Sequence, residues 1–244
     1  MRPLIIMNGE KIDWFHTVIR MLMYLAGVAV LALGMSLQTA SGLGVAALTC
    51  FATTLSMLTG KTLGFWITAT YVAYIVAQFT ILRREFQPRI LLELCFSTLI
   101  GGFTDFFMAV NPLHPAVLPI QVETMLLSLA VTAFGVSLVV NMGVVPNAPD
   151  GLVQVIADKI KRRFGDVKVV FDCSHVAVSL VLSLALMHNL GGFGVTTAIS
   201  ALFLGHVVTI ALSARHLENS TTAKPASSAY FAISHYTLLY LAIS

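Results

Sequence analysis

Six long apolar segments dominate the sequence, and each is about as long as a helix that crosses a lipid bilayer. Only 10% of the 244 residues are charged, whereas a soluble domain uses roughly 25%. Continuous apolar runs of roughly 20 residues suit membrane helices, not the alternating ten-residue strands of a membrane barrel. We therefore predict an all-α integral membrane protein with six transmembrane helices: Val18–Leu37, Leu63–Leu82, Ile90–Val110, Leu118–Val140, Lys168–His188 and Val195–Ala214.

Two further segments have helical patterns but are not expected to cross. If Gly42–Gly60 stays on one side and the N-terminus is cytoplasmic, only Lys61 of the 14 Lys and Arg residues lies outside. The positive-inside rule favours this arrangement, with both termini cytoplasmic. Asp150–Arg163 carries too many charges to cross, and we expect an amphipathic helix against the cytoplasmic side. Its side chains expected to face the bundle are Leu152, Val153, Ile156 and Ile160.

The two halves of the chain share a pattern at an offset of 101 residues. An Ala-x-Gly-x-Ser-Leu pattern around Gly34 recurs around Gly135, and Gly42 recurs as Gly143. Each unit reads as a span, a glycine-rich break, a short non-spanning helix and two more spans. Because three crossings are an odd number, the second unit must be inverted relative to the first. The predicted parts are a cytoplasmic segment 1–17, membrane repeats 18–110 and 118–214, and a cytoplasmic tail 215–244.

Three glycine-rich motifs stand out along the chain. They are Gly34-Met35-Ser36-Leu37 with Gly42, Gly143-Val144-Val145-Pro146 with Asp150-Gly151-Leu152, and Gly191-Gly192-Phe193-Gly194 running to Leu204-Gly205. Together they resemble the YczE/YyaS/YitT family of bacterial inner-membrane proteins, and its YczE branch most closely. The chain departs from the family's pattern at Val45, which stands where the second half has Pro146. The resemblance implies a multi-pass protein of the bacterial inner membrane and implies no particular activity.

The sequence contains no motif typical of catalysis, phosphate binding or a metal centre. Its seven histidines form no ligand pair backed by a carboxylate at metal-binding spacing, and its net charge of +3 comes from short basic loops. Such loops are topology signals rather than a nucleic-acid surface. We therefore expect no enzyme, no cofactor and no nucleic-acid partner. The expected partners are the lipid bilayer and an unknown small solute, and a homo-oligomer is left open.

The glycine-rich breaks are the first candidate functional elements. Transporters built from inverted repeats place interrupted helices at matching positions, with their helix ends facing the solute. The break residues are Gly42 and Gly44 in the first half and Gly143, Pro146 and Gly151 in the second. Asp150 would cap the helix that follows the second break. The alternative is that the glycines only allow tight turns and close helix packing.

Ionisable residues inside apolar segments are the second set of candidates, because a charge in a bilayer is costly. Asp172 and His175 lie three residues apart on one helical face, and His206 lies at mid-membrane depth in the last segment. We predict a solute site near these three residues, between the two halves. The rival interpretation is a structural cluster in which Asp172 accepts a hydrogen bond from His175.

Other polar residues complete the predicted site. The break from Pro146 through Asn147 to Asp150 is expected to close the site from the cytoplasm. Asp105 is a further candidate within its own span, whereas Glu93 is expected to reach the cytoplasmic interface.

Transport of a small solute between the two units is the function that the sequence favours. The competing class is a membrane scaffold or regulatory module that transports nothing and acts on a partner protein. A polar cavity joining Asp105 or Asp172 to both breaks would favour transport, and a dry interface between the halves would favour the scaffold.

Overall fold

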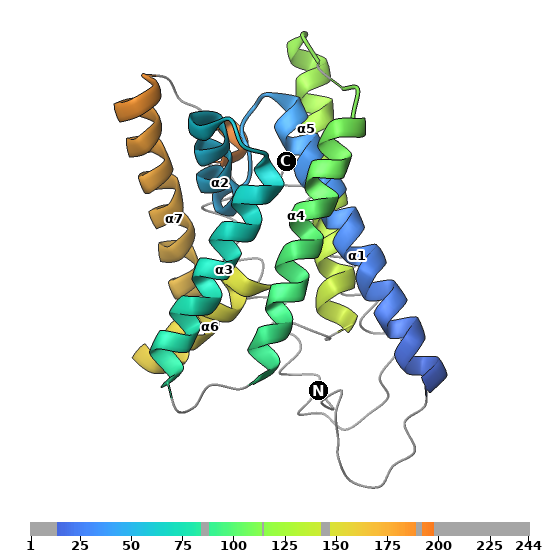
Figure 1. The fold of residues 1–244 in the computed structure, drawn as a ribbon. Coiled ribbons are helices and arrows are strands. Elements are labelled where there is room, and N and C mark those ends of the chain that lie inside the picture. The colour runs from blue at the N-terminus through green and yellow to red at the C-terminus, as the bar shows by residue number, and fades with distance from the viewer. Residues whose placement is uncertain (1–13, 84–87, 114, 143–146, 189–191, 198–244) are drawn as a thin grey trace, which may run out of the picture.

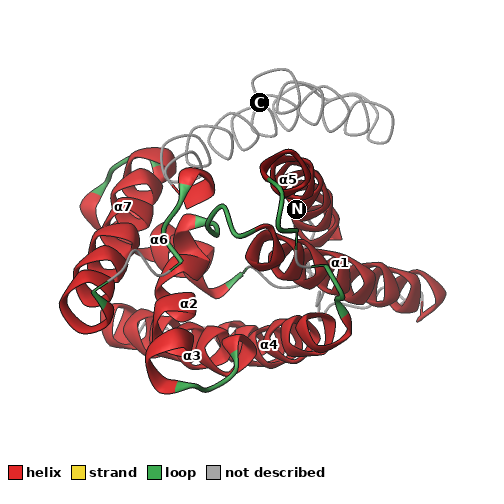
Figure 2. Ribbon diagram, turned by 90° about the horizontal axis from the view of Figure 1, so that it is seen from above, coloured by secondary structure: helices red, strands yellow, loops and turns green. Residues whose placement is uncertain are grey.

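The computed structural model describes residues 14–83, 88–113, 115–142, 147–188 and 192–197. Within this part, the chain forms helices joined by short loops and no strands (Figures 1 and 2). The elements are α1 (Trp14–Ser41), α2 (Ala47–Thr59), α3 (Leu63–Leu82), a 3-10 turn η2 (Pro88–Leu91), α4 (Leu92–Val110), α5 (Leu118–Met142), α6 (Ala148–Ile160), α7 (Phe164–Leu182) and a π turn η3 (Ser183–Met187).

Five of the helices are long and apolar enough to cross a membrane. The apolar segments are Val18–Ser41, Leu63–Leu82, Leu92–Val110, Leu118–Val139 and Phe164–Met187. They coincide with the first five predicted spans, so an all-α protein with several membrane helices is confirmed. Apolar side chains such as Val76, Phe106 and Val181 point outward and are more than half exposed, as expected for contact with lipid. The sixth predicted span, Val195–Ala214, lies almost wholly outside the described residues.

The loops that join the short helix α2 to α1 and to α3 lie at the same end of the bundle. At that end, the amide of Gly64 at the start of α3 donates to Asp105 Oδ1 near the end of α4, at 2.7 Å. Asn111, directly after α4, donates through Nδ2 to Ser36 Oγ near the end of α1, at 3.2 Å. The end of α1 and the start of α3 therefore lie at the same end (Figure 1). The segment Gly42–Gly60 does not cross the bundle, in agreement with the prediction.

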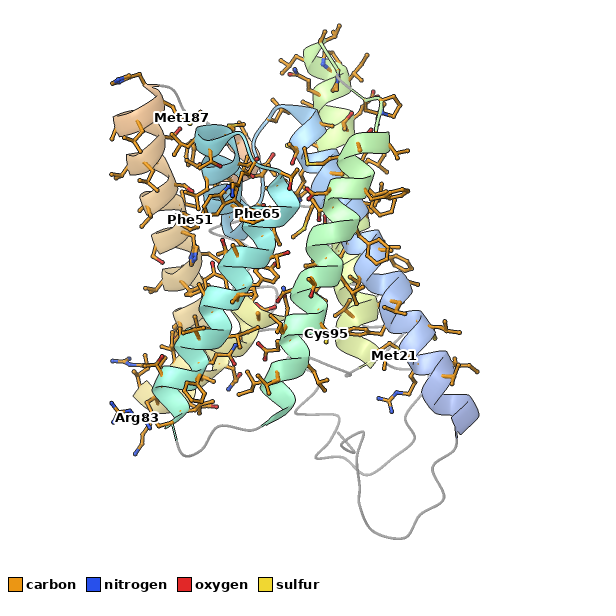
Figure 3. The ribbon with its side chains drawn as sticks, in the orientation of Figure 1. Met21, Phe51, Phe65, Arg83, Cys95 and Met187 are labelled. Atoms are coloured by element: carbon orange, nitrogen blue, oxygen red, sulfur yellow. The ribbon has the colours of Figure 1, made fainter. Side chains whose placement is uncertain are left out.

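The other short helix, α6, lies at the opposite end (Figure 1). There, Arg20 in α1 donates to the carbonyl of Met142 at the end of α5, at 2.6 Å. Gln78 near the end of α3 donates to the carbonyl of Ala148 at the start of α6, at 3.2 Å. Arg83, which follows α3, lies at this end too (Figure 3). Each short helix therefore sits at its own end of the bundle.

The buried face of α6 differs from the predicted face in its last turn. Leu152 and Val153 are buried as predicted, and Ile156 packs against the core while partly buried. The prediction for Ile160 is wrong, because this side chain is exposed and Ala157 is buried in its place. Ile160 is the last helical residue, since Lys161 adopts a left-handed conformation with φ of 55° and turns the chain away.

Helix α1 packs mainly against α5, and the two run in opposite directions. A Cβ added to Gly34 would lie 2.8 Å from the backbone nitrogen of Thr132, and one added to Gly135 would lie 2.6 Å from that of Leu31. The two contacts are equivalent under the 101-residue offset, which matches 34 with 135 and 31 with 132. The repeated glycines thus let the two backbones approach closely.

Candidate functional site

Lys168 lies between two carboxylates in the interior of the bundle. Its Nζ is 3.0 Å from Oδ1 of Asp150 and 3.3 Å from Oδ1 of Asp172. The side chain of Lys168 is 1% exposed and that of Asp172 is 0% exposed, whereas that of Asp150 is 36% exposed. We call these three residues the ion cluster. Asp150 is therefore the member of the ion cluster whose side chain is partly exposed at the surface.

Local helix geometry brings the ion cluster together. Asp172 follows Lys168 by four residues, so both side chains lie on one face of α7. The prediction that Asp150 caps α6 is wrong, because the N-cap residue is Asn147. Asp150 lies in the first turn instead, where Pro149 suits a helix start and a negative side chain interacts favourably with the unpaired amides. Because α6 packs against α3 and α7, its first turn is held beside Lys168.

The ion cluster is held by ion contacts rather than by well-aligned hydrogen bonds. Among the described residues, Lys168 Nζ, Asp150 Oδ1 and both carboxylate oxygens of Asp172 are buried without a hydrogen-bond partner, so the ion contacts lack hydrogen-bond geometry. The Tyr71 hydroxyl and the Asn147 side chain are buried beside the cluster and lie within hydrogen-bonding reach of each other. Buried polar groups in proteins are normally paired. Asp172, which is fully buried and whose Oδ1 has only the Lys168 contact, is suited to holding a polar ligand.

A second polar pair lies next to the ion cluster. Gln78 Nε2 donates to Glu93 Oε2 at 2.7 Å, and Glu93 is 1% exposed. The expectation that Glu93 reaches the cytoplasmic interface is therefore wrong, because Gln78 provides a hydrogen-bond donor inside the bundle. A Cβ added to Gly151 would lie 2.8 Å from Glu93 Oε1. Gly151 is thus needed for the close approach of α6 to this pair.

His175 does not pair with Asp172, although both lie on α7. Its Nδ1 is 2.8 Å from the carbonyl oxygen of Phe171, and its Nε2 is 2.5 Å from the Tyr74 hydroxyl on α3. The ring of Phe51 on α2 approaches His175 edge to face, with 6.2 Å between the ring centroids. His175 therefore joins α3 to α7 within an aromatic group, next to the ion cluster along α7.

The first glycine-rich break is an ordered loop. Gly42 and Gly44 have φ angles of 71° and 98°, a left-handed conformation that other residues rarely adopt. The amide of Val45 donates to the carbonyl of Gly192 at 3.2 Å, which ties the loop to segment 192–197 beyond α7. The two glycines are therefore required by the backbone itself.

Asp105 lies at the opposite end of the bundle from the ion cluster. It accepts the hydrogen bond from the Gly64 amide and so caps the first turn of α3. Gly64 packs against the Gly101 carbonyl, where an added Cβ would lie 2.0 Å from the oxygen. The structure thus separates Asp105 from Asp172. A hollow of about 110 Å³ opens at the Asp105 end and is lined by Ser36, Thr39, Ala40, Met108, Asn111 and Leu113.

The structure brings together Asn147, Asp150 and Asp172 of the predicted site, with His175 beside them. His206, Gly143 and Pro146 lie outside the described residues. Sequence reasoning missed Lys168, because it was counted as a basic residue flanking a span. The four-residue spacing between Lys168 and Asp172 was the sequence signal that could have identified this ion pair. The described residues contain no group of three His, Cys, Asp or Glu side chains placed to hold a metal ion.

Within the described residues, five apolar helices that are long enough to cross a membrane define a multi-pass, helical membrane protein. Residues 18–213 match the sequence profile described as a family of unknown function, DUF6198, and the chain belongs to this family. The match includes all five candidate spans and every member of the ion cluster. No curated protein and no solved structure matches the chain significantly.

Proposed function

We propose that the protein transports a small solute, which binds at the ion cluster and passes between segments 18–110 and 118–214. The observation that carries this proposal is the position of Lys168, which is 1% exposed and lies between two carboxylates in an apolar helix. Lys168 and Asp172 are the fifth and ninth residues of the apolar segment Phe164–Met187, and a charge buried within such a helix costs up to roughly 2.5–3.5 kcal/mol on insertion scales. Buried ion pairs rarely repay such costs in stability, so a functional role explains them better.

We further propose that the two segments are inverted repeats, as in many secondary transporters. Three observations support this arrangement: α5 runs opposite to α1, α6 lies at the opposite end from α2, and α7 runs opposite to α3 (Figure 1). The reciprocal glycine contacts between α1 and α5 support it as well, because they obey the same sequence offset. The short helices then occupy equivalent places in the two repeats, next to the ion cluster in one case and segment 192–197 in the other.

The same proposal includes the location and the six-span topology. Arg83 lies at the end of the bundle where α6 lies (Figures 1 and 3). The last turn of α6 and the residues after it carry the exposed Lys159, Lys161, Arg162 and Arg163. The positive-inside rule places that end in the cytoplasm, together with both termini. The resemblance to the YczE/YyaS/YitT family supports a bacterial inner membrane as the location.

The test begins with purified protein and a panel of anionic, cationic and neutral small solutes. A solute that binds the folded state raises the melting temperature, with about 2.7 kcal/mol of stabilisation at 100 times its Kd. Solutes that stabilise the protein are then followed for uptake into proteoliposomes. We expect Asp172→Asn to lose both responses and Asp166→Asn, an exposed carboxylate on the same helix, to keep them.

Absence of uptake above that of empty vesicles, for every stabilising solute, would contradict transport. Stabilisation by a partner protein without any solute uptake would instead favour the scaffold.

A further inference from the structure

We infer that the solute of the ion cluster is a small monovalent cation, an inference that rests on the proposed function. The ion cluster contains two carboxylates, Asp150 and Asp172, but one ammonium group, that of Lys168. With all three groups ionised, it carries one net negative charge. The N-terminal dipole of α6 offsets roughly half a charge, which leaves the site negative and attractive to a cation.

The buried atoms of the ion cluster are mostly acceptors. Both oxygens of Asp172 are buried without a hydrogen bond among the described residues, and Oδ1 has the Lys168 contact at 3.3 Å. The single ammonium group, Lys168 Nζ, is shared between two carboxylates, and the Tyr71 hydroxyl, which can donate or accept, lies beside Asn147. A cation would satisfy these oxygens, whereas an anion would face them at close range. The hydrogen-bonding capacity of the ion cluster therefore favours a cation, as its net charge does.

The groups next to the ion cluster do not reverse its sign. Glu93 adds a third carboxyl beside Gly151. Tyr74 and Phe171 pack against each other with ring centroids 5.5 Å apart and add no positive charge. His175 is engaged by Tyr74 and by the Phe171 carbonyl. No further Lys or Arg among the described residues forms an ion pair with the two aspartates of the ion cluster.

Lys168 acts as the resident counter-ion of this site. Its Nζ contacts of 3.0 and 3.3 Å to the two carboxylates have the dimensions of an ammonium group between oxygens. An incoming cation must compete with this tethered ammonium, and only a small one fits where Lys168 Nζ now lies. Removal of the Lys168 charge should therefore strengthen cation binding, whereas removal of an aspartate charge should weaken it.

The experiment measures the melting temperature of the full-length protein in detergent at constant ionic strength. Sodium, potassium and methylammonium chlorides are titrated against choline chloride, whose bulky quaternary cation serves as the control. Comparison of sodium and potassium with methylammonium shows whether the site binds alkali ions or protonated amines. Choline acetate and choline phosphate test anions. The variants are Lys168→Gln, Asp172→Asn and Asp150→Asn, with Asp166→Asn as the matched control.

We expect at least one small cation to stabilise the wild type and Asp166→Asn more than choline does. Lys168→Gln should lower the half-saturating concentration about tenfold, as expected if the resident ammonium occupies the site nine-tenths of the time. Asp172→Asn should abolish the response. Asp150→Asn should weaken the response to the cation. If Asp172→Asn does not fold, Asp150→Asn still tests the effect of removing a carboxylate charge.

Two results would overturn the inference. In the first, no small cation exceeds choline in either the wild type or Lys168→Gln. In the second, an anion stabilises the wild type and Lys168→Gln abolishes that effect. The second result would leave the proposed transport function intact, with an anionic solute in place of a cation.

Discussion

Gln78 Nε2 donates to Glu93 Oε2 at 2.7 Å, which ties the end of α3 to the start of α4 inside the bundle. The same nitrogen lies 3.2 Å from the carbonyl oxygen of Ala148 and donates to it as well. One side-chain amide therefore joins three helices, and it holds the start of α6 in the position where Asp150 meets Lys168.

Replacement of Glu93 by alanine should destabilise the protein by about 1–3 kcal/mol, because a buried amide hydrogen of Gln78 loses its acceptor. The measurement is thermal unfolding in detergent. Glu123→Ala serves as the control, since Glu123 is exposed on α5 and surface changes usually stay within about 0.5 kcal/mol. Equal effects of the two substitutions would mean that the Gln78–Glu93 bond does not support the fold.

Gly151→Ala should lower the melting temperature, because its Cβ would lie 2.8 Å from Glu93 Oε1 and 3.1 Å from Gln78 Nε2. Gly102→Ala is the matched control, since nothing lies within 4 Å of its Cβ position on α4. Alanine there should be neutral or stabilise the helix by up to about 1 kcal/mol. A Gly151→Ala protein as stable as the Gly102→Ala protein would argue against close packing of α6 on α3 and α4.

Substitutions in the ion cluster should be strongly coupled. Breaking a buried ion pair by removing one partner typically costs about 3–5 kcal/mol, so Lys168→Gln, which leaves Asp172 buried without a cation, should destabilise the protein strongly. Asp172→Asn should cost less, because Lys168 keeps its contact with Asp150. The double substitution should cost clearly less than the two single effects together, because the only carboxylate it leaves without a cation is the partly exposed Asp150. Thermal unfolding of all four proteins gives the coupling, and strictly additive effects would show that the two charges do not interact.

The topology is tested with reporter fusions. A reporter placed after Arg84 should report the cytoplasm, and one placed at Pro112 should report the opposite side. The motivation is that Arg83 and Asn111 lie at opposite ends of the bundle and that basic residues favour the cytoplasmic side. Both reporters on one side would contradict the arrangement of α3 and α4.

The sequence predicted the helical spans well, because apolar length alone determines which segments can cross a bilayer. It also placed α2 and α6 correctly as segments that do not cross, from the charges of the loops and of α6. The partners of individual side chains were harder to predict. Glu93 was assigned to the interface because charged side chains near helix ends usually reach water, and Lys168 was counted only as a cytoplasmic basic residue. Their partners Gln78 and Asp150 come from other helices.

The predicted site illustrates the same limit. Helical spacing correctly placed Asp172 and His175 on one helix, but it could not show that they engage different partners. Asp150 is 22 residues before Asp172, and only the packing of α6 against α7 brings both to Lys168. Asp105 was predicted as a site residue on the same kind of sequence evidence. In the structure, it accepts a hydrogen bond from the Gly64 amide and caps the first turn of α3.

The position of Lys168 and Asp172 on one helix also bears on how the protein is made. Lys and Asp each raise the free energy of insertion at a helix centre by roughly 2.5–3.5 kcal/mol. Four residues apart, the two side chains can neutralise each other while α7 is still an isolated helix leaving the translocon. Asp150 has by then been synthesised on α6, and its docking completes the cluster after insertion. The pairing within α7 thus lets the helix enter the lipid with the charges of Lys168 and Asp172 cancelled, while the exposed Asp166 stays in the first turn at the end of the segment.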